Sequence, residues 1–212
     1  MSVSNELPTP IALVTGATSG IGREVARKLA ADGFSVLVHG RDAARGAAVV
    51  AEIVADGGRA RFAAADLTDA ADLERLATEA ADVDVLVNNA GFSWFGPTAD
   101  LAPATFDAMY AANVRSAYFL VAAIAPVMAK RGTGVIINLG SMAGQIGLAG
   151  GAAYSATKAA LASLTRSWAA EFSPQGVRVN TVAPGPAYTD GAAPERTAAL
   201  GKTTLLAGRA QV

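Results

Sequence analysis

The chain has 212 residues, a length typical of one domain, and its 52% hydrophobic and 17% charged residues can form a large core, which excludes a disordered protein. Its net charge of −1, with no basic block, no apolar run of about 18 residues and no basic N-terminal start, excludes the usual signatures of nucleic-acid binding, membrane insertion and secretion. With no Cys and one His, disulfides, thiol nucleophiles and metal sites are excluded, and we expect a cytoplasmic protein.

Apolar runs with strand character alternate with helical patterns along the whole chain. In chain order, these patterns predict a strand at 11–15, a helix at 21–31, a strand at 35–39, a helix at 43–55, a strand at 60–65, a helix at 69–80, a strand at 83–87, a helix at 103–129, a strand at 134–139, a helix at 152–172 and a strand at 177–182. Thr68 is placed to cap the helix at 69–80, and Pro126 is expected to kink the last turn of the helix at 103–129.

This alternation predicts an α/β fold with one doubly wound parallel sheet, because strands joined by helices pair in parallel through right-handed crossovers. Six strands are expected, with helices on both faces, so that the fold has three layers and is Rossmann-like. Ligands of such sheets bind beyond the carboxyl ends of the strands. We therefore looked for polar and glycine-rich segments that directly follow the predicted strands.

The first such segment is "ALVTGATSGIGREVA", where the strand at 11–15 passes into the helix at 21–31. Gly16, Gly20 and Gly22 lie at this junction in the order Gly-x-x-x-Gly-x-Gly. Glycines there let the backbone approach a pyrophosphate, which the free N–H groups of a helix N-terminus attract. A plain strand-helix turn would also explain three glycines, so the loop alone does not decide between the two interpretations.

Further motifs fall on the same sheet edge or on the helices beside it. Each of them has an ordinary explanation, such as a turn asparagine, a loop serine or a surface Tyr-Lys pair. Their order and their common edge are what favour a single site. They are Asn88-Asn89-Ala90-Gly91, Asn113 within the long helix, Ser141, the pair Tyr154 and Lys158 four residues apart on one helix face, and Pro184-Gly185.

The segments "TGATSGIG" (15–22), "NNAG" (88–91), "YSATK" (154–158) and "PGPAYT" (184–189), with Asn113 and Ser141, resemble the marks of the classical short-chain dehydrogenase/reductase family. The resemblance covers nearly the whole chain and implies one NAD(P)-binding Rossmann-fold domain over residues 1–212. It implies the catalytic residues Asn113, Ser141, Tyr154 and Lys158. It also implies a cofactor site formed by Gly16, Thr18, Ser19, Gly20, Ile21, Gly22, Arg41, Asp66, Leu67, Asn89, Ala90, Gly91, Tyr154, Lys158, Pro184, Gly185 and Thr189.

The chemistry of carbonyl reduction is consistent with these residue types. The free phenol has a pKa near 10, and a neighbouring ammonium favours the phenolate, so Lys158 can activate Tyr154 as an acid and base. By the resemblance, Lys158 also holds the nicotinamide ribose. Ser141 can stabilise charge on the substrate oxygen, and the family places a water of the proton relay at Asn113. His39 is expected at a solvated or cofactor-edge position.

The end of the second strand, "LVHGRDAARG", bears on the choice of cofactor. The position that matches the family's ribose-binding acid is Gly40, and Arg41 follows it. An acid there would repel a 2′-phosphate, whereas Arg offers a planar set of donors for it. We therefore expect NADP rather than NAD. The alternative is an exposed Arg41 followed by Asp42 as a helix cap. Asp66 resembles the family residue that contacts the adenine.

The helices that carry Asn113 and Tyr154 are apolar or rich in small residues around most of their circumference, which predicts burial against a second subunit. Simple alanine richness is the alternative. Residues 190–212 resemble the start of the family's substrate loop, and the family's last helix and strand are not found after it. We expect an NADP-dependent oxidoreductase acting on a small-molecule carbonyl or secondary alcohol. The second hypothesis is a dinucleotide-binding protein without turnover.

Overall fold

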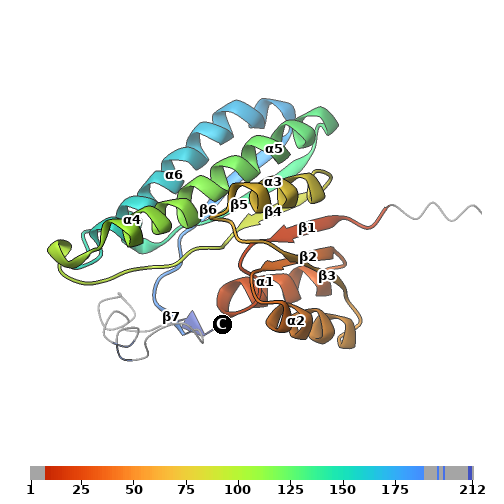
Figure 1. Cartoon of the computed structure of the whole chain (residues 1–212). Helices are drawn as coiled ribbons and strands as arrows, with labels where there is room; N and C mark the ends of the chain where they lie inside the picture. The colour runs from red at the N-terminus through yellow and green to blue at the C-terminus, as the bar shows by residue number, and fades with distance from the viewer. Residues whose placement is uncertain (1–7, 189–194, 196–197, 199–209, 212) are drawn as a thin grey trace, which may run out of the picture.

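The computed structural model describes residues 8–188, 195, 198 and 210–211. Within these residues, six strands form one parallel sheet in the order β3-β2-β1-β4-β5-β6 (Figure 1). They are β1 (Ile11–Val14), β2 (Ser35–Gly40), β3 (Arg59–Ala64), β4 (Val85–Asn88), β5 (Gly134–Leu139) and β6 (Val177–Val182), and a separate short pair joins β7 (Ala187–Tyr188) to β8 (Ala210–Gln211). The predicted doubly wound α/β fold is confirmed. The predicted start of a substrate loop at 190–212 falls largely outside the described residues.

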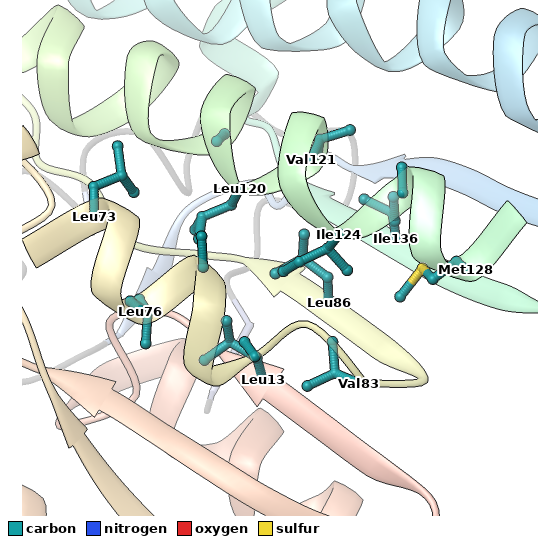
Figure 2. Close-up of a cluster of buried hydrophobic side chains, with 14 of the residues drawn as sticks. Leu13, Leu73, Leu76, Val83, Leu86, Leu120, Val121, Ile124, Met128 and Ile136 are labelled. Atoms are coloured by element: carbon teal, nitrogen blue, oxygen red, sulfur yellow. The ribbon is translucent and has the colours of Figure 1, made fainter. Parts of the chain in front are cut away.

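Helices cover both faces of the sheet, as predicted. In Figure 1, α1 (Gly20–Ala31) and α2 (Ala43–Ala55) lie on one face, and α3 (Ala70–Glu79), α5 (Ser116–Arg131) and α6 (Ala152–Phe172) lie on the other. Two buried clusters match these layers: one contains Val49 and Ile53 of α2, and the other contains Leu76 of α3 and Leu161 of α6. Figure 2 shows part of the second cluster, in which strand residues meet helix residues; it labels Leu13, Leu73, Leu76, Val83, Leu86, Leu120, Val121, Ile124, Met128 and Ile136.

Side-chain caps set the start of two helices. The Asp42 carboxylate accepts the N–H of Arg45 at 3.0 Å and begins α2, and Asp69 accepts the N–H of Asp72 at 2.9 Å and begins α3. The prediction that Thr68 caps α3 was wrong by one residue. The Thr68 N–H and hydroxyl both bind an oxygen of Asp66, so this residue belongs to the preceding turn.

The predicted helix at 103–129 is three consecutive segments. These are α4 (Pro103–Tyr110), a π-helical turn η2 (Ala111–Arg115) and α5. In η2 the N–H of Ser116 bonds the carbonyl of Ala111, five residues back. The kink at Pro126 stays a prediction, since α5 continues through Pro126 to Arg131, and a separate departure from α-helical hydrogen bonding lies earlier, in η2. π-Helical turns often mark functional sites, and this one carries Asn113.

The sequence was expected to contain no segment apolar enough to cross a membrane, and this same segment corrects that expectation. Residues Pro103–Arg131 are long and apolar enough, by length and composition, to pass a test for a membrane span. Core helices of folded proteins share this length and composition, and 44% of the most apolar 18 residues of this segment are buried within the fold. The buried residues include Leu120, Ile124 and Met128, which pack against the sheet (Figure 2).

Candidate active site

A cleft of about 560 Å³ lies at the carboxyl ends of the strands, where the chain order of the sheet reverses between β1 and β4. This is the position that a doubly wound sheet favours for a ligand. Most of the residues predicted for the cofactor and for catalysis line it: Gly16, Thr18, Ser19, Gly20, Ile21, Gly22, Arg41, Asp66, Leu67, Asn89, Ala90, Gly91, Ser141, Tyr154, Lys158, Pro184 and Gly185. Thr189 lies outside the described residues.

The glycine loop after β1 requires glycine for two different reasons. Gly16 and Gly20 have φ angles of +65° and +54°, in the left-handed region that other L-residues avoid. Gly22 is needed for space, because a Cβ on it would lie 2.3 Å from Nδ2 of Asn89 and 2.4 Å from the carbonyl oxygen of Gly16. The loop is therefore packed tightly against the turn that follows β4.

The start of α1 is suited to an anion. Ser19 occupies the N-cap position, but within the described part of the chain its side chain makes no capping hydrogen bond, and the first turn of α1 contains no acidic residue. The N–H groups of this turn are the unsatisfied donors that every helix N-terminus carries. Together with the helix dipole, they favour a phosphate or pyrophosphate at this end of the cleft.

Thr15 and Asn89 tie the glycine loop to the "NNAG" turn. The Thr15 hydroxyl oxygen accepts the N–H groups of Asn89 and Ala90, each at 3.0 Å. In return, Nδ2 of Asn89 donates to the carbonyls of Thr15 at 2.8 Å and Gly16 at 3.1 Å. Two motifs more than seventy residues apart in the chain therefore form one wall of the cleft.

Arg41 is the most available cation at the β2 end of the cleft. Its side chain is 76% exposed, and its nearest acid, Asp66, lies 4.0 Å away. Two neighbouring arginines are engaged: Arg23 binds Glu52 through two nitrogens, and Arg45 binds the helix cap Asp42. The prediction that Asp42 caps the next helix is therefore compatible with a binding role for Arg41.

Asp66 stays ionised at this edge. Hydrogen bonds from the N–H and the hydroxyl of Thr68 lower the pKa of the Asp66 carboxyl, and the charge of Arg41 adds to the effect.

Gly40 faces the glycine loop, because a Cβ on it would meet Cγ2 of Thr18 at 2.4 Å. A larger residue at this position would collide with the Thr18 side chain unless that side chain moved.

Tyr154, Lys158 and Ser141 line the cleft where β5 and α6 border it. Nζ of Lys158 lies 5.9 Å from the centre of the Tyr154 ring and donates to the carbonyl of Leu139 at 2.7 Å. Burial lowers the pKa of Lys158 to about 8. The Ser141 oxygen accepts the N–H of Ala143 at 3.1 Å, which leaves its O–H to donate into the cleft.

Asn113 lies behind the cleft and is not part of its lining. It is 2% exposed, and its carboxamide forms a pair of hydrogen bonds with the backbone of Phe92, each at 2.9 Å. Its Nδ2 also donates to the hydroxyl of Thr157 at 3.0 Å. Asn113 thus joins the loop after β4 to α6, the helix of Tyr154 and Lys158. The structure does not place its side chain beside them in the cleft.

Residues 10–199 match the family described as short chain dehydrogenase. The chain belongs to the short-chain dehydrogenase family.

Named relatives within the family act on different substrates. A 3-oxoacyl-[acyl-carrier-protein] reductase of Synechocystis sp. is 39% identical over 87% of this chain and 76% of its own length. A galactitol 2-dehydrogenase (L-tagatose-forming) of Cereibacter sphaeroides is 40% identical over 84% of this chain and 72% of its own. A solved metagenomic short-chain oxidoreductase in complex with NADP is 38% identical, with a TM-score of 0.80 over 96% of this chain and 95% of that one.

Several residues of the cleft were not predicted. They follow the strands or flank the family motifs, so their place at the strand ends was the signal available in the sequence; they are Arg45, Ala65, Thr68, Ser93, Ala112, Leu139, Gly140 and Ala187. Of the two positions expected for His39, solvated or at the edge of the cofactor site, the structure shows the second, because His39 is 3% exposed and lies among the residues that line the cleft. Among the described residues, no group of three acidic or His side chains could hold a metal ion.

Proposed function

We propose that this protein is an NADP-dependent oxidoreductase that interconverts a carbonyl and a secondary alcohol, with Tyr154 as the acid and base. The observation that carries the proposal is the geometry of one cleft. The buried Lys158 ammonium lies 5.9 Å from the centre of the Tyr154 ring, and the Ser141 hydroxyl and the anion-suited start of α1 line the same cleft. The known NADP complex of a 38% identical family member supports the choice of cofactor.

The residues that line the cleft fit a dinucleotide. The glycine loop and the N-terminus of α1 hold the pyrophosphate, Arg41 takes the 2′-phosphate, and Asp66 with Leu67 takes the adenine. When bound, the nicotinamide ring supplies or accepts the hydride. Further contacts that we assign to the cofactor come from Thr18, Ser19, Ile21, Asn89, Ala90, Gly91, Pro184, Gly185 and Thr189.

Two side chains act on the substrate oxygen, and a third, Lys158, acts through Tyr154. Ser141 donates a hydrogen bond to it and stabilises negative charge that develops there. Tyr154 donates the proton in reduction and accepts it in oxidation. Lys158 stabilises the phenolate and binds the nicotinamide ribose. Asn113 supports this group from behind, by fixing the Phe92 loop and Thr157, and we assign the relay water to its neighbourhood.

The direct test is NADPH consumption by the purified protein across a panel of ketones, β-keto thioesters and keto sugars, together with calorimetric titration of NADP⁺. We expect NADP⁺ binding and turnover of at least one carbonyl class. Binding without any turnover across the panel would favour the second hypothesis, a dinucleotide-binding protein. A cytoplasmic location belongs to the proposal, since a reducing compartment maintains the NADPH pool that reduction needs.

Changing Arg41 to Asp is expected to shift the preference from NADPH toward NADH, by at least about tenfold in the ratio of kcat/KM values. The substitution removes a phosphate partner and adds a repelling charge, so both effects act in one direction. The matched control is Arg59→Asp, since Arg59 starts β3 at the far end of the strand and does not line the cleft. An unchanged ratio in the Arg41 variant would place the phosphate elsewhere.

We also propose a homo-oligomer formed through α4, α5 and α6. Phe106 on α4 is 40% exposed, and on α5 the neighbouring rings of Tyr118 and Phe119, 5.5 Å apart between centroids, are 46% and 51% exposed. Exposed apolar side chains on these helices favour a protein–protein interface. Changing Phe119 to Asp should therefore lower the mass measured by light scattering at micromolar concentration. Val54→Asp is the control, because Val54 is 55% exposed on α2. Equal masses for both variants and the unaltered protein would contradict this interface.

A further inference from the structure

His39 connects the ends of three strands beneath the cleft. It is the penultimate residue of β2, is 3% exposed, and its ring lies between the glycine loop after β1 and the end of β3. Nδ1 accepts the N–H of Gly16 at 3.1 Å, and Nε2 lies 3.1 Å from the carbonyl oxygen of Ala65. The backbone carbonyl of His39 also accepts the N–H of Ala17 at 2.8 Å.

These contacts permit one tautomer of the imidazole. The backbone N–H of Gly16 can only donate, so Nδ1 must carry no proton. The carbonyl of Ala65 can only accept, so Nε2 must carry one. Burial lowers the pKa of His39 to about 4. The charges of Arg41 and Arg75 act in the same direction, and the charge of Asp66 acts against it. The ring is therefore neutral at physiological pH, and its acceptor is always available to the loop.

Gly16 is the residue through which this contact reaches the cofactor site. Its N–H is held by His39, and its carbonyl accepts from Nδ2 of Asn89 at 3.1 Å. Both polar groups of its backbone are thus fixed, in a left-handed conformation at φ +65°. Gly16 begins the loop that leads into the first turn of α1, so a change in its orientation would move the N–H groups that follow it.

We propose that His39 is a positioning residue for the dinucleotide: it fixes the glycine loop in the geometry that binds the pyrophosphate. This inference rests on the proposed function. In the proposed function the loop holds the pyrophosphate, which NADP and NAD share, whereas Arg41 binds the 2′-phosphate, which only NADP carries. Loss of the His39 acceptor therefore weakens the binding of both dinucleotides by the same factor, whereas loss of 2′-phosphate recognition would weaken the binding of NADP alone.

The test compares the unaltered protein with His39→Leu and His39→Asn. Leu fills similar space without an acceptor, whereas Oδ1 of Asn lies one bond from Cγ, as Nδ1 does, and can accept from Gly16. Calorimetry at pH 7 measures Kd for NADP⁺ and for NAD⁺. In the Leu variant we expect both values to rise by about 3- to 10-fold, the effect of one hydrogen bond, with KM for the cofactor raised and kcat at saturation kept. The Kd values of the Asn variant should stay within about twofold of those of the unaltered protein, because the Gly16 hydrogen bond is kept and its loss would cause a larger change.

Several outcomes would overturn the inference. A folded Leu variant with unaltered Kd values would make His39 a packing residue only, and unequal changes for the two dinucleotides would place its effect outside the pyrophosphate site. If the Leu variant does not fold, His39→Gln replaces it, since Gln reaches Ala65 but offers no acceptor at the Nδ1 position; equal affinities of the Asn and Gln variants would then overturn the inference. Failure of the unaltered protein to bind either dinucleotide would instead overturn the proposed function, and this inference with it.

Discussion

Replacing Tyr154 by Phe is expected to lower kcat by about 10²–10⁴-fold, the usual contribution of a general acid or base. The substitution keeps the ring, which packs at 5.5 Å between centroids against Phe95, and removes only the hydroxyl. The affinity for NADP⁺ should therefore stay within about twofold, because its main contacts come from the glycine loop and Arg41, and loss of one hydrogen bond costs about this much at the low end. Stopped-flow measurement of single turnovers would separate the chemical step from product release.

Tyr110→Phe is the matched control for this result. Tyr110 ends α4, stacks on Phe106 at 4.6 Å between ring centroids and does not line the cleft, so loss of its hydroxyl should leave kcat unchanged. A Tyr154→Phe variant that keeps the full rate of the chemical step would show that another group supplies the proton.

Replacing Lys158 by Met is expected to lower kcat/KM by about 10²–10³-fold, the scale of losing one preorganised electrostatic contact at the reacting oxygen. The same variant should be no less stable than the unaltered protein at pH 7. Met keeps the apolar stem, and it removes a buried ammonium whose desolvation opposes folding. This relief offsets the loss of the hydrogen bond to Leu139, which costs about 1–3 kcal/mol when a carbonyl is left unpaired.

The stability of the unaltered protein should also depend on pH through Lys158. Its pKa is about 8 in the fold and 10.5 in the unfolded chain. Between these values the unfolded chain binds the additional proton, so the free energy of unfolding rises with pH, by up to about 3 kcal/mol across the window. Below pH 8 the cost of burial is fully present, and above pH 10.5 it is absent.

Denaturant melts from pH 7 to 10.5 would measure this slope as the difference between the unaltered protein and Lys158→Met. Lys130→Met is the control, because Lys130 is exposed at the end of α5 and is not desolvated on folding. Parallel curves for the unaltered protein and the Lys158 variant would show that the ammonium is not desolvated in the fold.

The sequence allowed most of the sheet and of the cleft to be predicted, because both depend on local signals. An apolar run marks each buried strand, and glycine-rich or polar residues that follow a strand must lie at the same edge of a parallel sheet. Gly16, Asn89 and Ser141 could be placed together by this rule alone. Tyr154 and Lys158 followed from their spacing on one helix.

What could not be predicted depends on contacts between distant segments. The π-helical turn has no clear sequence signal, and the position of Asn113 behind the cleft follows from partners in the Phe92 loop and in α6. His39 is held by Gly16 and Ala65, which follow two other strands, β1 and β3. A single polar residue in a strand predicts a polar contact, but the sequence does not indicate which residue forms that contact.

The order of the strands has a consequence for how the protein is made. β1 pairs with β2 on one side, but its other neighbour is β4, and the contact between Ile11 and Asp84 joins residues 73 positions apart. At the usual rates of synthesis, of about 5–20 residues per second, one edge of β1 waits about 4–15 s for its partner on the ribosome. An open edge of an apolar strand is a site for mispairing during that interval. The glycine loop meets the "NNAG" turn once β4 has docked, but the cleft also includes Pro184 and Gly185, so a nascent chain completes it only after β6 has been made.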